Sequence, residues 1–193
     1  MYNLLIGGAA GQGIDTVADI LEKLLKRSGY NVFTARDFMS RIRGGHNFSL
    51  IRFGTEKIMA HSNQLDGIVA LNQETIDLHL AELKADGFIL SDTSFAKEDA
   101  RGIKIDMDNV AKELGNPRYA GSVAIGALLM LFSEKLELVE GVLRSFLAEK
   151  HIAGNLEPLK NGYGQVKEKY PHLTGEFADD MLINGNTALA LGA

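Results

Sequence analysis

The chain has 193 residues, of which 46% are hydrophobic and 23% charged, and its formal net charge is -5. This length is typical of one domain, or of one domain with an appendage, and it can bury a substantial core. Because the sequence contains no cysteine, disulfides, thiolate nucleophiles and cysteine-ligated zinc or iron–sulfur centres are excluded within it. Basic residues are scattered between acidic ones, a pattern that argues against binding to nucleic acid.

Membrane and targeting segments are not predicted either. The longest apolar run, residues 123–132, is much shorter than the ~20 residues that a membrane span requires. The first three residues lack the basic region of a signal peptide and lead directly into a strand-like segment. We therefore expect a cytoplasmic protein that does not interact with a membrane.

The N-terminal segment combines an apolar strand, a glycine-rich turn and an amphipathic helix. Residues 2–6 are predicted to form a buried parallel strand, and residues 14–27 show the apolar i, i+3, i+4 spacing of a helix that stops at Gly29. Glycine allows positive φ and close approach of a ligand, and a helix N-terminus offers unpaired N–H groups. We therefore expect phosphate or pyrophosphate to bind at the four glycines of this turn, Gly7, Gly8, Gly11 and Gly13.

The spacing of these glycines restricts the class of ligand. Gly8, Gly11 and Gly13 follow the order G-x-x-G-x-G, which reverses the dinucleotide fingerprint, so a nicotinamide-binding fold is not assumed. No Lys-Ser or Lys-Thr pair follows the turn, which excludes a P-loop nucleoside triphosphatase. The alternative is a tight strand-to-helix turn without a ligand, although four glycines in seven residues exceed what such a turn requires.

A second strand is predicted over residues 31–35, which gives a β-loop-helix-β unit. Such a unit begins a doubly wound sheet, whose binding crevice lies at the carboxyl ends of the strands. The loop after this strand should therefore lie beside the glycine turn. Its arginines are candidates to bind the same anion, and a solvated loop is the alternative: Arg36, Arg41 and Arg43.

The same loop contains two further features. Gly44 and Gly45 would give the backbone room to approach a ligand, or would form a turn into the next strand. His46 follows them, and a single histidine in this setting is more often a hydrogen-bonded structural residue than a catalyst. We therefore assign it no catalytic role.

Further strands are predicted over residues 47–53, 66–71 and 88–90, with residues 57–60 as a short hairpin partner. Polar residues follow two of these strands: Asn72, Ser91 and Asp92. They would face the crevice and are candidates to contact a ligand. Capping of the next turn is the commoner role for such residues, and we favour it.

From Asp106 onward the chain is predicted to be mostly helical. Residues 119–136 are apolar around most of the helix, and Gly121 and Gly126 permit close packing, so this helix should be buried or pressed against another protein. An amphipathic helix follows over 138–147, and a weaker one, interrupted by Gly162 and Gly164, over 155–170. Residues 181–193 are apolar, and we expect them either to dock on another subunit or to begin a further domain.

Groups that would form an active site are not evident. The sequence shows no Ser/His/Asp set, no paired carboxylates and no His-x-x-x-His spacing, and its five histidines are dispersed. We therefore predict no catalytic and no metal-binding residues in this chain. The expected function is binding.

Four segments together resemble one known family, the gamma subunit or gamma domain of 2-oxoacid:ferredoxin oxidoreductases. They are Gly8-Ala9-Ala10-Gly11-Gln12-Gly13 after a strand, Arg43-Gly44-Gly45 before a strand, residues 66–72 and Val123-Ala124-Ile125-Gly126-Ala127 in a late helix. The resemblance covers nearly the whole chain. It implies a Rossmann-like three-layer α/β domain with a mostly parallel sheet and a helical C-terminal segment.

The resemblance also implies a function. In this family the gamma domain joins alpha and beta subunits, and in some members delta, that carry thiamine diphosphate and iron–sulfur clusters. Together they convert a 2-oxoacid and coenzyme A to an acyl-CoA, carbon dioxide and reduced ferredoxin. The gamma domain is associated with coenzyme A, and the residues carried over as its binding site are Gly8, Ala9, Gly11, Gln12, Gly13, Arg43, Gly44 and Gly45.

The tail extends the resemblance. Residues 183–193 look like the opening of the alpha domain in members where gamma and alpha are fused, as in many 2-oxoglutarate-type enzymes, which makes 2-oxoglutarate one candidate substrate. The gamma domain would then comprise residues 1–180 and the start of an alpha domain residues 181–193. One departure is that Gly121-Ser122 stand where many members carry Asn.

Two other classes of function remain open from the sequence. A stand-alone nicotinamide- or flavin-dependent oxidoreductase would use the glycine turn for the pyrophosphate of its cofactor. A ligand-sensing module would bind an anion without associating with any enzyme. Neither class requires the partner subunits that the family resemblance implies.

Overall fold

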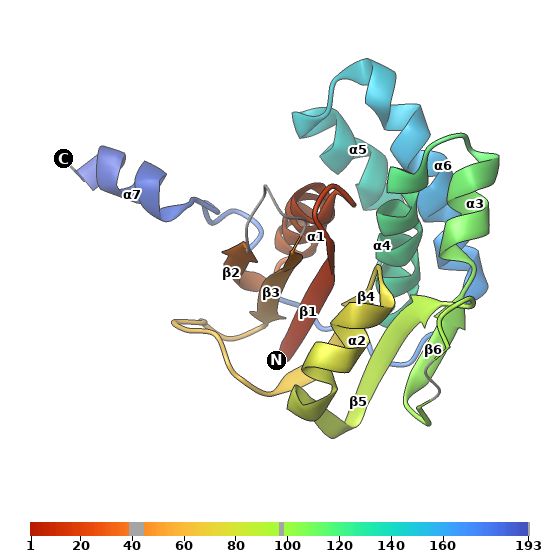
Figure 1. The fold of residues 1–193 in the computed structure, drawn as a ribbon. Helices are drawn as coiled ribbons and strands as arrows, with labels where there is room; N and C mark the ends of the chain where they lie inside the picture. Colours follow the sequence, from red (N-terminus) through yellow and green to blue (C-terminus); the bar gives the residue numbers. More distant parts are fainter. Residues whose placement is uncertain (39–44, 97–98, 193) are drawn as a thin grey trace.

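The computed structural model describes residues 1–38, 45–96 and 99–192. A six-stranded sheet with the order β2-β3-β1-β4-β5-β6 forms its centre (Figure 1). Strand β3 runs antiparallel to β1 and β2, and the pairs β1–β4, β4–β5 and β5–β6 are parallel, so the mostly parallel sheet is confirmed. The strands are β1 (Tyr2–Ala9), β2 (Asn31–Phe38), β3 (His46–Gly54), β4 (Leu65–Ala70), β5 (Leu83–Asp92) and β6 (Gly102–Ile105).

Helices pack on both faces of the sheet, as a three-layer domain requires (Figure 1). Helices α1 and α4 cover one face, α6 packs on the outer side of α4, and the short helix α2 covers part of the other face. The helices are α1 (Ile14–Arg27), α2 (Gln73–His79), α3 (Met107–Glu113), α4 (Ala120–Leu131), α5 (Glu137–Phe146), α6 (Glu149–Gln165) and α7 (Gly185–Gly192), with 3-10 turns η1 (Leu80–Glu82) and η2 (Pro117–Tyr119).

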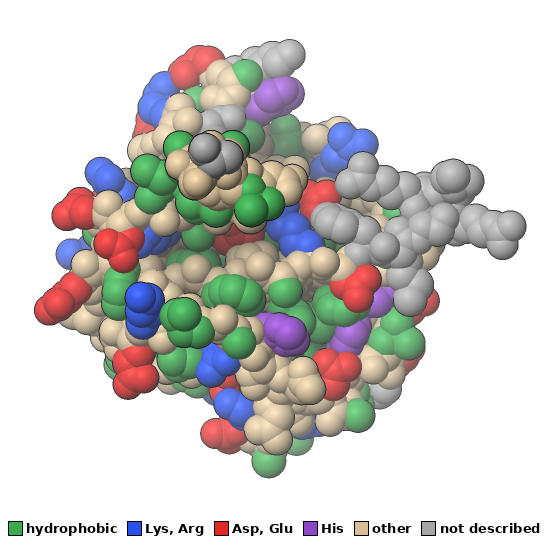
Figure 2. Space-filling model, turned by 90° about the vertical axis from the view of Figure 1, so that its left-hand side faces the viewer, with side chains coloured by type: hydrophobic (Ala, Val, Ile, Leu, Met, Phe, Trp, Pro, Cys, Tyr) green, Lys and Arg blue, Asp and Glu red, His purple; other side chains and the backbone are tan. Residues whose placement is uncertain are grey.

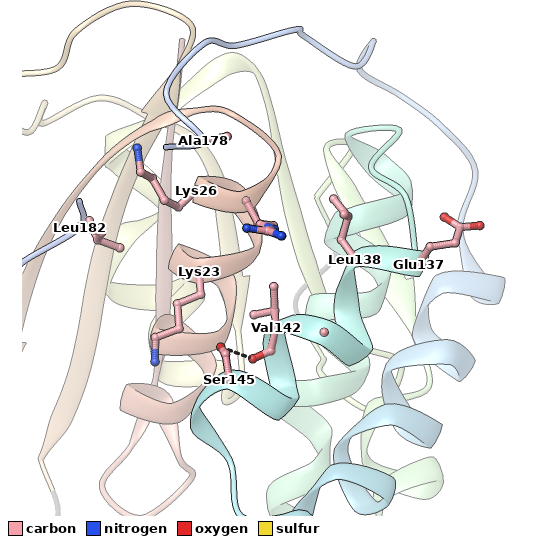
Figure 3. Close-up of a pocket in the computed structure, with 10 residues that line it drawn as sticks. Lys23, Lys26, Glu137, Leu138, Val142, Ser145, Ala178 and Leu182 are labelled. Atoms are coloured by element: carbon pink, nitrogen blue, oxygen red, sulfur yellow. Dashed lines mark hydrogen bonds between the residues drawn. The ribbon is translucent and has the colours of Figure 1, made fainter. Parts of the chain in front are cut away.

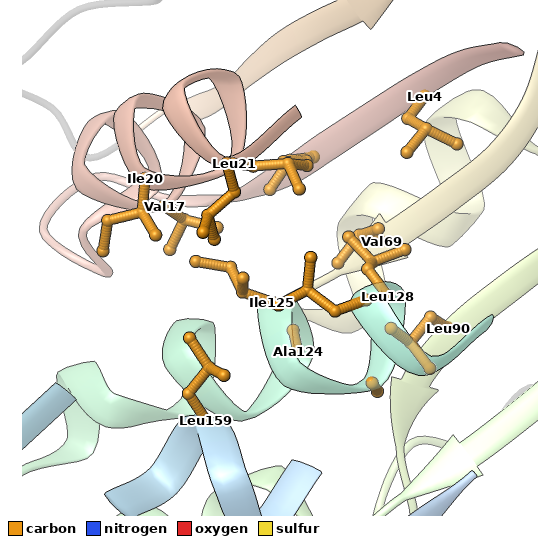
Figure 4. Close-up of a cluster of buried hydrophobic side chains, with 14 of the residues drawn as sticks. Leu4, Val17, Ile20, Leu21, Val69, Leu90, Ala124, Ile125, Leu128 and Leu159 are labelled. Carbon is orange, nitrogen blue, oxygen red and sulfur yellow. The ribbon is translucent and has the colours of Figure 1, made fainter. Parts of the chain in front are cut away.

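The main core lies between α1, α4 and the sheet (Figure 4). Val17 and Leu21 of α1 lie opposite Ile125 of α4, and Val69 of β4 and Leu90 of β5 belong to the same core. Each of these side chains is at most 3% exposed. Burial of a large aliphatic side chain contributes about 1.5 to 3 kcal/mol, so this layer of the core stabilises the whole fold.

Helix α4 is buried because it lies between the sheet and α6. A Cβ on Gly126 would overlap the carbonyl oxygen of Leu159, and a Cβ on Gly162 would overlap that of Val123. The predicted close packing of α4 is therefore confirmed. The predicted interruption at Gly162 and Gly164 is wrong, because α6 continues through both glycines where the first of them packs against α4.

Other strand predictions need correction. Strand β1 extends to Ala9, so Gly7 and Gly8 belong to the sheet and not to the turn. Residues 57–60 form no strand. Instead Ile58 is 8% exposed, and its backbone N–H donates to the Asn31 side-chain oxygen at 2.9 Å. Strand β6 was not expected from the sequence.

The C-terminal segment differs from the body of the domain. Helix α7 contains no buried residue, and the exposed fractions of Leu189 and Leu191 are 75% and 69%. Figure 1 shows α7 extending away from the sheet, and Figure 2, which faces that side, shows hydrophobic side chains on the surface. Across residues 1–38, 45–96 and 99–192, no helix combines the length and apolar character that a membrane crossing demands.

Candidate functional site

The turn between β1 and α1 is shorter than predicted. Its positive-φ glycines are Gly11, with φ of 93°, and Gly13, with φ of 81°. A Cβ at either position would meet no atom within 4 Å, so the space beside both glycines is open. Gly13 precedes α1 and no side chain caps this helix, which leaves N–H groups of the first turn for another acceptor.

The first two glycines serve packing instead. A Cβ on Gly7 would lie 2.6 Å from Cγ2 of Thr75 and 2.9 Å from Cε1 of His46. A Cβ on Gly8 would lie 2.6 Å from Oε1 of Gln12. Neither glycine has a positive φ. The expectation that all four glycines form the turn is therefore corrected.

Gln12 holds the turn against the sheet. Its Oε1 accepts a hydrogen bond from the backbone N–H of Ala9 at 2.6 Å, and its Nε2 donates to the carbonyl of Leu71 at 2.9 Å. Leu71 follows β4, the strand next to β1. The Gln12 carboxamide thus links the ends of two strands and positions the backbone of the turn.

Two cavities adjoin the turn. One of ≈ 390 Å³ is lined by Gly11, Gly13, the first turn of α1, Asn47 and Phe48. Another of ≈ 290 Å³ extends from Gly11 and Gln12 toward α3 and η2. Arg118 of η2 lines both cavities and therefore supplies a positively charged residue to each of them.

Arg118 was not predicted from the sequence as a site residue. It lies more than 100 residues from the glycine turn and follows Asn116 and Pro117, a pattern that indicates only a turn. The Asn116 side chain caps this turn by accepting from the Arg118 backbone N–H at 3.1 Å. The Arg118 residue is exposed, and its guanidinium forms no ion pair with any residue the structure describes.

Acidic groups near the cavities offset part of this positive charge. Asp15 lines the larger cavity, and its carboxylate lies 3.9 Å from Arg36. Asp108 lines the smaller one together with Lys112. Burial and the nearby Asp92 carboxylate raise the pKa of Asp108, against the opposing effect of Lys112.

The predicted arginine loop is described only in part. Arg36 donates to carboxylates of α1, Asp19 at 2.6 Å and Glu22 at 2.8 Å, so its guanidinium is engaged within the domain. Arg41, Arg43 and Gly44 lie outside the described residues. Gly45 precedes β3, whose first residue, His46, is paired with Ala9, so the end of this loop does lie at the edge of the sheet where the glycine turn begins.

His46 forms a buried pair with His79. Their Nε2 atoms are 3.0 Å apart, and the residues are 4% and 7% exposed. His79 also contacts Glu82 through Nδ1 at 3.0 Å. Burial, and next the nearby His79, lower the pKa of His46. The hydrogen bond joins β3 to α2 inside the domain.

The three polar strand-end residues have different environments. Asn72 caps α2 by accepting from the N–H of Thr75 at 3.0 Å. Asp92 accepts from the N–H of Ser94 in the next turn, and also from the N–H groups of Met107 and Asp108 at the start of α3, each at 2.8 Å. Ser91 is buried inside β5. Capping, which we favoured, is confirmed for Asn72 and Asp92.

A separate cavity of ≈ 520 Å³ lies at the other end of α1 (Figure 3). Lys23, Lys26 and Arg27 line it from α1, opposite Ser145, whose hydroxyl donates to the carbonyl of Val142 at 2.6 Å. The Lys26 ammonium donates to the carbonyl of Phe177. This cavity therefore marks where the C-terminal segment crosses the body of the domain.

Groups of three or more His, Asp or Glu side chains that could hold a metal ion were not found among the residues described. The open turn and its cavities therefore form the candidate site, and its groups suit an anion. Backbone N–H groups at a helix N-terminus and a guanidinium both bind phosphate oxygens.

A comparison with known protein families identifies the family of this chain. The family model described as pyruvate ferredoxin/flavodoxin oxidoreductase matches residues 3–165. The chain belongs to this family. The predicted family resemblance is thereby confirmed.

Individual proteins resemble the chain in sequence or in fold. The chain is 31% identical over 80 residues to the alpha subunit of a 2-oxoacid:ferredoxin oxidoreductase from Sulfolobus sp, a match of 42% of this chain and 13% of that protein. The keto/oxoacid ferredoxin oxidoreductase gamma subunit from Geobacter sulfurreducens PCA has a TM-score of 0.74 at 23% identity, covering 85% of this chain and 95% of the gamma subunit.

A third relative contains ligands. The 2-oxoglutarate:ferredoxin oxidoreductase from Magnetococcus marinus, solved with 2-oxoglutarate, coenzyme A and succinyl-CoA, has a TM-score of 0.86 at 24% identity. The match covers 99% of this chain and 36% of that one. The family member described here thus spans a small part of the alpha subunit and about a third of the Magnetococcus chain.

Proposed function

We propose that this chain is a gamma-type subunit or domain of a 2-oxoacid:ferredoxin oxidoreductase, and that its glycine turn helps to bind coenzyme A. One observation carries the ligand proposal: the open turn at Gly11 and Gly13 adjoins two cavities that share Arg118. Coenzyme A carries a diphosphate, the kind of anion that such groups recognise. The coenzyme A in the Magnetococcus relative supports the choice of ligand.

Each residue of the turn has a distinct part in this proposal. The absence of side chains at Gly11 and Gly13 lets the diphosphate approach the backbone and the N-terminus of α1. Gln12 acts as a positioning residue, because both ends of its carboxamide bond the backbone of neighbouring strands. Gly8 leaves room for that carboxamide, and the backbone N–H of Ala9 donates a hydrogen bond to its oxygen.

Arg43, Gly44 and Gly45 complete the proposed site. Gly45 lies at the same edge of the sheet as the turn, which supports this part of the proposal. The contribution of Arg43 and Gly44 stays a prediction, since both lie outside the described residues. Arg118 is added to the predicted set because it lines both cavities beside the open glycines.

In the assembled enzyme the chain would serve binding and assembly. The reaction would be the oxidative decarboxylation of a 2-oxoacid, with 2-oxoglutarate as one candidate, to an acyl-CoA. Thiamine diphosphate on partner subunits would supply the decarboxylation chemistry, and iron–sulfur clusters on partners would pass electrons to ferredoxin. This chain would hold coenzyme A and contact the alpha and beta subunits, and delta where it is present.

The tail is proposed to belong to the neighbouring alpha unit, with the gamma domain at 1–180 and the alpha segment at 181–193. Up to Phe177 the chain is tied to the body, because the Phe177 N–H donates to the carbonyl of Gly29 at 2.9 Å. Beyond that point α7 has no buried residue. An apolar helix that its own domain does not cover is typical of a segment that packs on a partner.

The ligand proposal can be tested by titrating the 193-residue chain with coenzyme A in a calorimeter. Replacing Arg118 by Ala should weaken binding about tenfold or more, because a charge-assisted hydrogen bond contributes roughly 1.5 to 3 kcal/mol. Arg27→Ala is the matched control, since Arg27 ends the same helix whose N-terminus forms the site. Failure of the wild-type chain to bind coenzyme A, or equal effects of the two substitutions, would contradict the proposal.

The assembly proposal needs a different measurement. The chain, purified gently from its own cells, should bring with it larger subunits that contain iron and thiamine diphosphate. Recovery of the chain alone and free of cofactor would instead favour an independent binding module.

A further inference from the structure

A third cavity, of ≈ 270 Å³, begins at the glycine turn and extends into the domain between α1, α4 and α6. Gly13 and Arg118 line it, and both residues also line the cavity proposed for the diphosphate. Ligand sites are commonly about 300 to 1,000 Å³, and this cavity is therefore sized for one part of a larger ligand. Its other lining residues are Thr16, Val17, Ile20, Asn116, Tyr119, Ser122, Leu147, His151 and Asn155.

One side of this cavity carries a polar pair held in place by hydrogen bonds. Ser122, which is 3% exposed, donates from Oγ to Oδ1 of Asn155 at 2.8 Å. Asn155 in turn donates from Nδ2 to the carbonyl of His151 at 2.8 Å. A carboxamide has two N–H donors and two acceptor lone pairs, so Asn155 retains one donor and one acceptor.

Apolar and aromatic side chains line another part of the cavity. Val17 and Ile20 contribute from α1, Leu147 from the C-terminal end of α5, and Tyr119 from η2. A Cβ on Gly154 would overlap the Tyr119 hydroxyl, so glycine at this position lets the tyrosine ring pack against α6. A flat heteroaromatic ring would gain contact area from walls of this kind.

We propose that this cavity binds the adenine base of a nucleotide whose phosphates lie on the glycine turn, with Asn155 as the residue that recognises the base. The proposal rests on the phosphate site proposed above. Adenine presents a donor at N6 beside an acceptor at N7, and Asn pairs with that edge through one acceptor and one donor. Asn155 has one acceptor and one donor left for this pairing, because Ser122 and the His151 carbonyl occupy the others.

This arrangement makes a prediction about specificity. Guanine presents two acceptors, O6 and N7, on the same edge, so its O6 would face the acceptor oxygen of Asn155. Ser122 fixes that oxygen by donating to it, which hinders a flip of the carboxamide. The cavity should therefore prefer adenine to guanine.

The test compares three probes on the full 193-residue chain by calorimetry: adenosine diphosphate, guanosine diphosphate and inorganic pyrophosphate. We expect adenosine diphosphate to bind about tenfold more tightly than guanosine diphosphate, as one bidentate base contact allows, and more tightly than pyrophosphate. Equal binding of the two nucleotides, with pyrophosphate bound, would overturn the base site but leave the phosphate site standing. Binding of none of the three would overturn both.

A matched pair of substitutions locates the effect. Asn155→Asp keeps the size of the side chain but removes the donor to N7, so the preference for adenine should disappear. Asn161→Asp adds the same charge on the same helix, where Asn161 contacts Gln165, and should keep the preference. A preference that survives Asn155→Asp in a chain with an unchanged melting curve would contradict the proposal, as would its loss in Asn161→Asp.

Discussion

The two glycine pairs of the N-terminal stretch have opposite environments. Gly7 and Gly8 lie in β1, where a Cβ would meet Thr75, His46 or Gln12 at 2.6 to 2.9 Å. Gly11 and Gly13 lie in the turn, where a Cβ would meet nothing within 4 Å and where φ is positive. The first pair is required for packing and the second for backbone conformation, although the sequence presents all four as one motif.

This difference separates stability from binding within seven residues. A side chain on the first pair would push apart β1 and the residues packed on it. A side chain on the second pair would strain the backbone and project into the space proposed for the diphosphate. Substitutions in the two pairs should therefore give different phenotypes, which makes the comparison testable.

The largest effect on stability is expected for Gly7→Ala. The new methyl group would press on Thr75, which is fully buried and donates to Asn72, so the free energy of unfolding should fall by about 2 kcal/mol, as in other overpacked cores. Urea unfolding measures the change. The control is Gly141→Ala, at an open position inside α5, which should be neutral or stabilising by up to about 1 kcal/mol.

A smaller effect on stability, joined to a loss of binding, is expected for Gly13→Ala. The left-handed backbone conformation costs a non-glycine residue roughly 1 kcal/mol, and the methyl group would occupy the mouth of the diphosphate cavity. Calorimetry with coenzyme A should show weaker binding. Gly115→Ala is the control, because Gly115 has φ of 78° and an open environment but does not line the cavities at the turn. Similar coenzyme A affinity in the two variants would count against the assignment of Gly13.

The smallest effect on stability is expected from a change of pH. It should arise at His46, which lies beside Gly7. Burial and the nearby His79 lower the pKa of His46 below its usual 6.5, so the unfolded chain binds a proton more readily than the folded one. This contribution to stability is present above pH 6.5 and is lost as the pH falls through the pKa of the folded state.

Urea unfolding between pH 7.5 and 5.5 measures that contribution. His46→Gln should make the pH dependence shallower, whereas His61→Gln should not, because His61 is exposed. The same slope in both variants would show that His46 does not carry the effect.

Local patterns were sufficient to predict much of the fold. The apolar stripe of α1, the cap at Asn72 and the buried character of α4 each depend on neighbours close in the sequence or on one helix face. The sheet was predicted less completely. Strand β6 is only four residues long and buries only Ile105, so it lacks the apolar run that reveals a buried strand.

The candidate site was predicted only in part, because its groups come together through tertiary contacts. The role of Gly7 depends on Thr75, 68 positions later, and no local pattern distinguishes a packing glycine from a turn glycine. Arg118 reaches the turn through η2 and carries no motif of its own. The periodicity and spacing of residues cannot predict such contacts, because the sheet and its crossover connections bring together residues that are far apart in the sequence.

The most direct measurement of the central claim is an amide 1H–15N NMR titration of the full chain with coenzyme A. If the turn holds the diphosphate, the largest shifts should fall on the N–H groups of residues 11–16, where α1 has no side-chain cap. Shifts confined to residues 23–27, at the separate cavity on the far end of α1, would contradict the account, as would a spectrum that coenzyme A leaves unchanged.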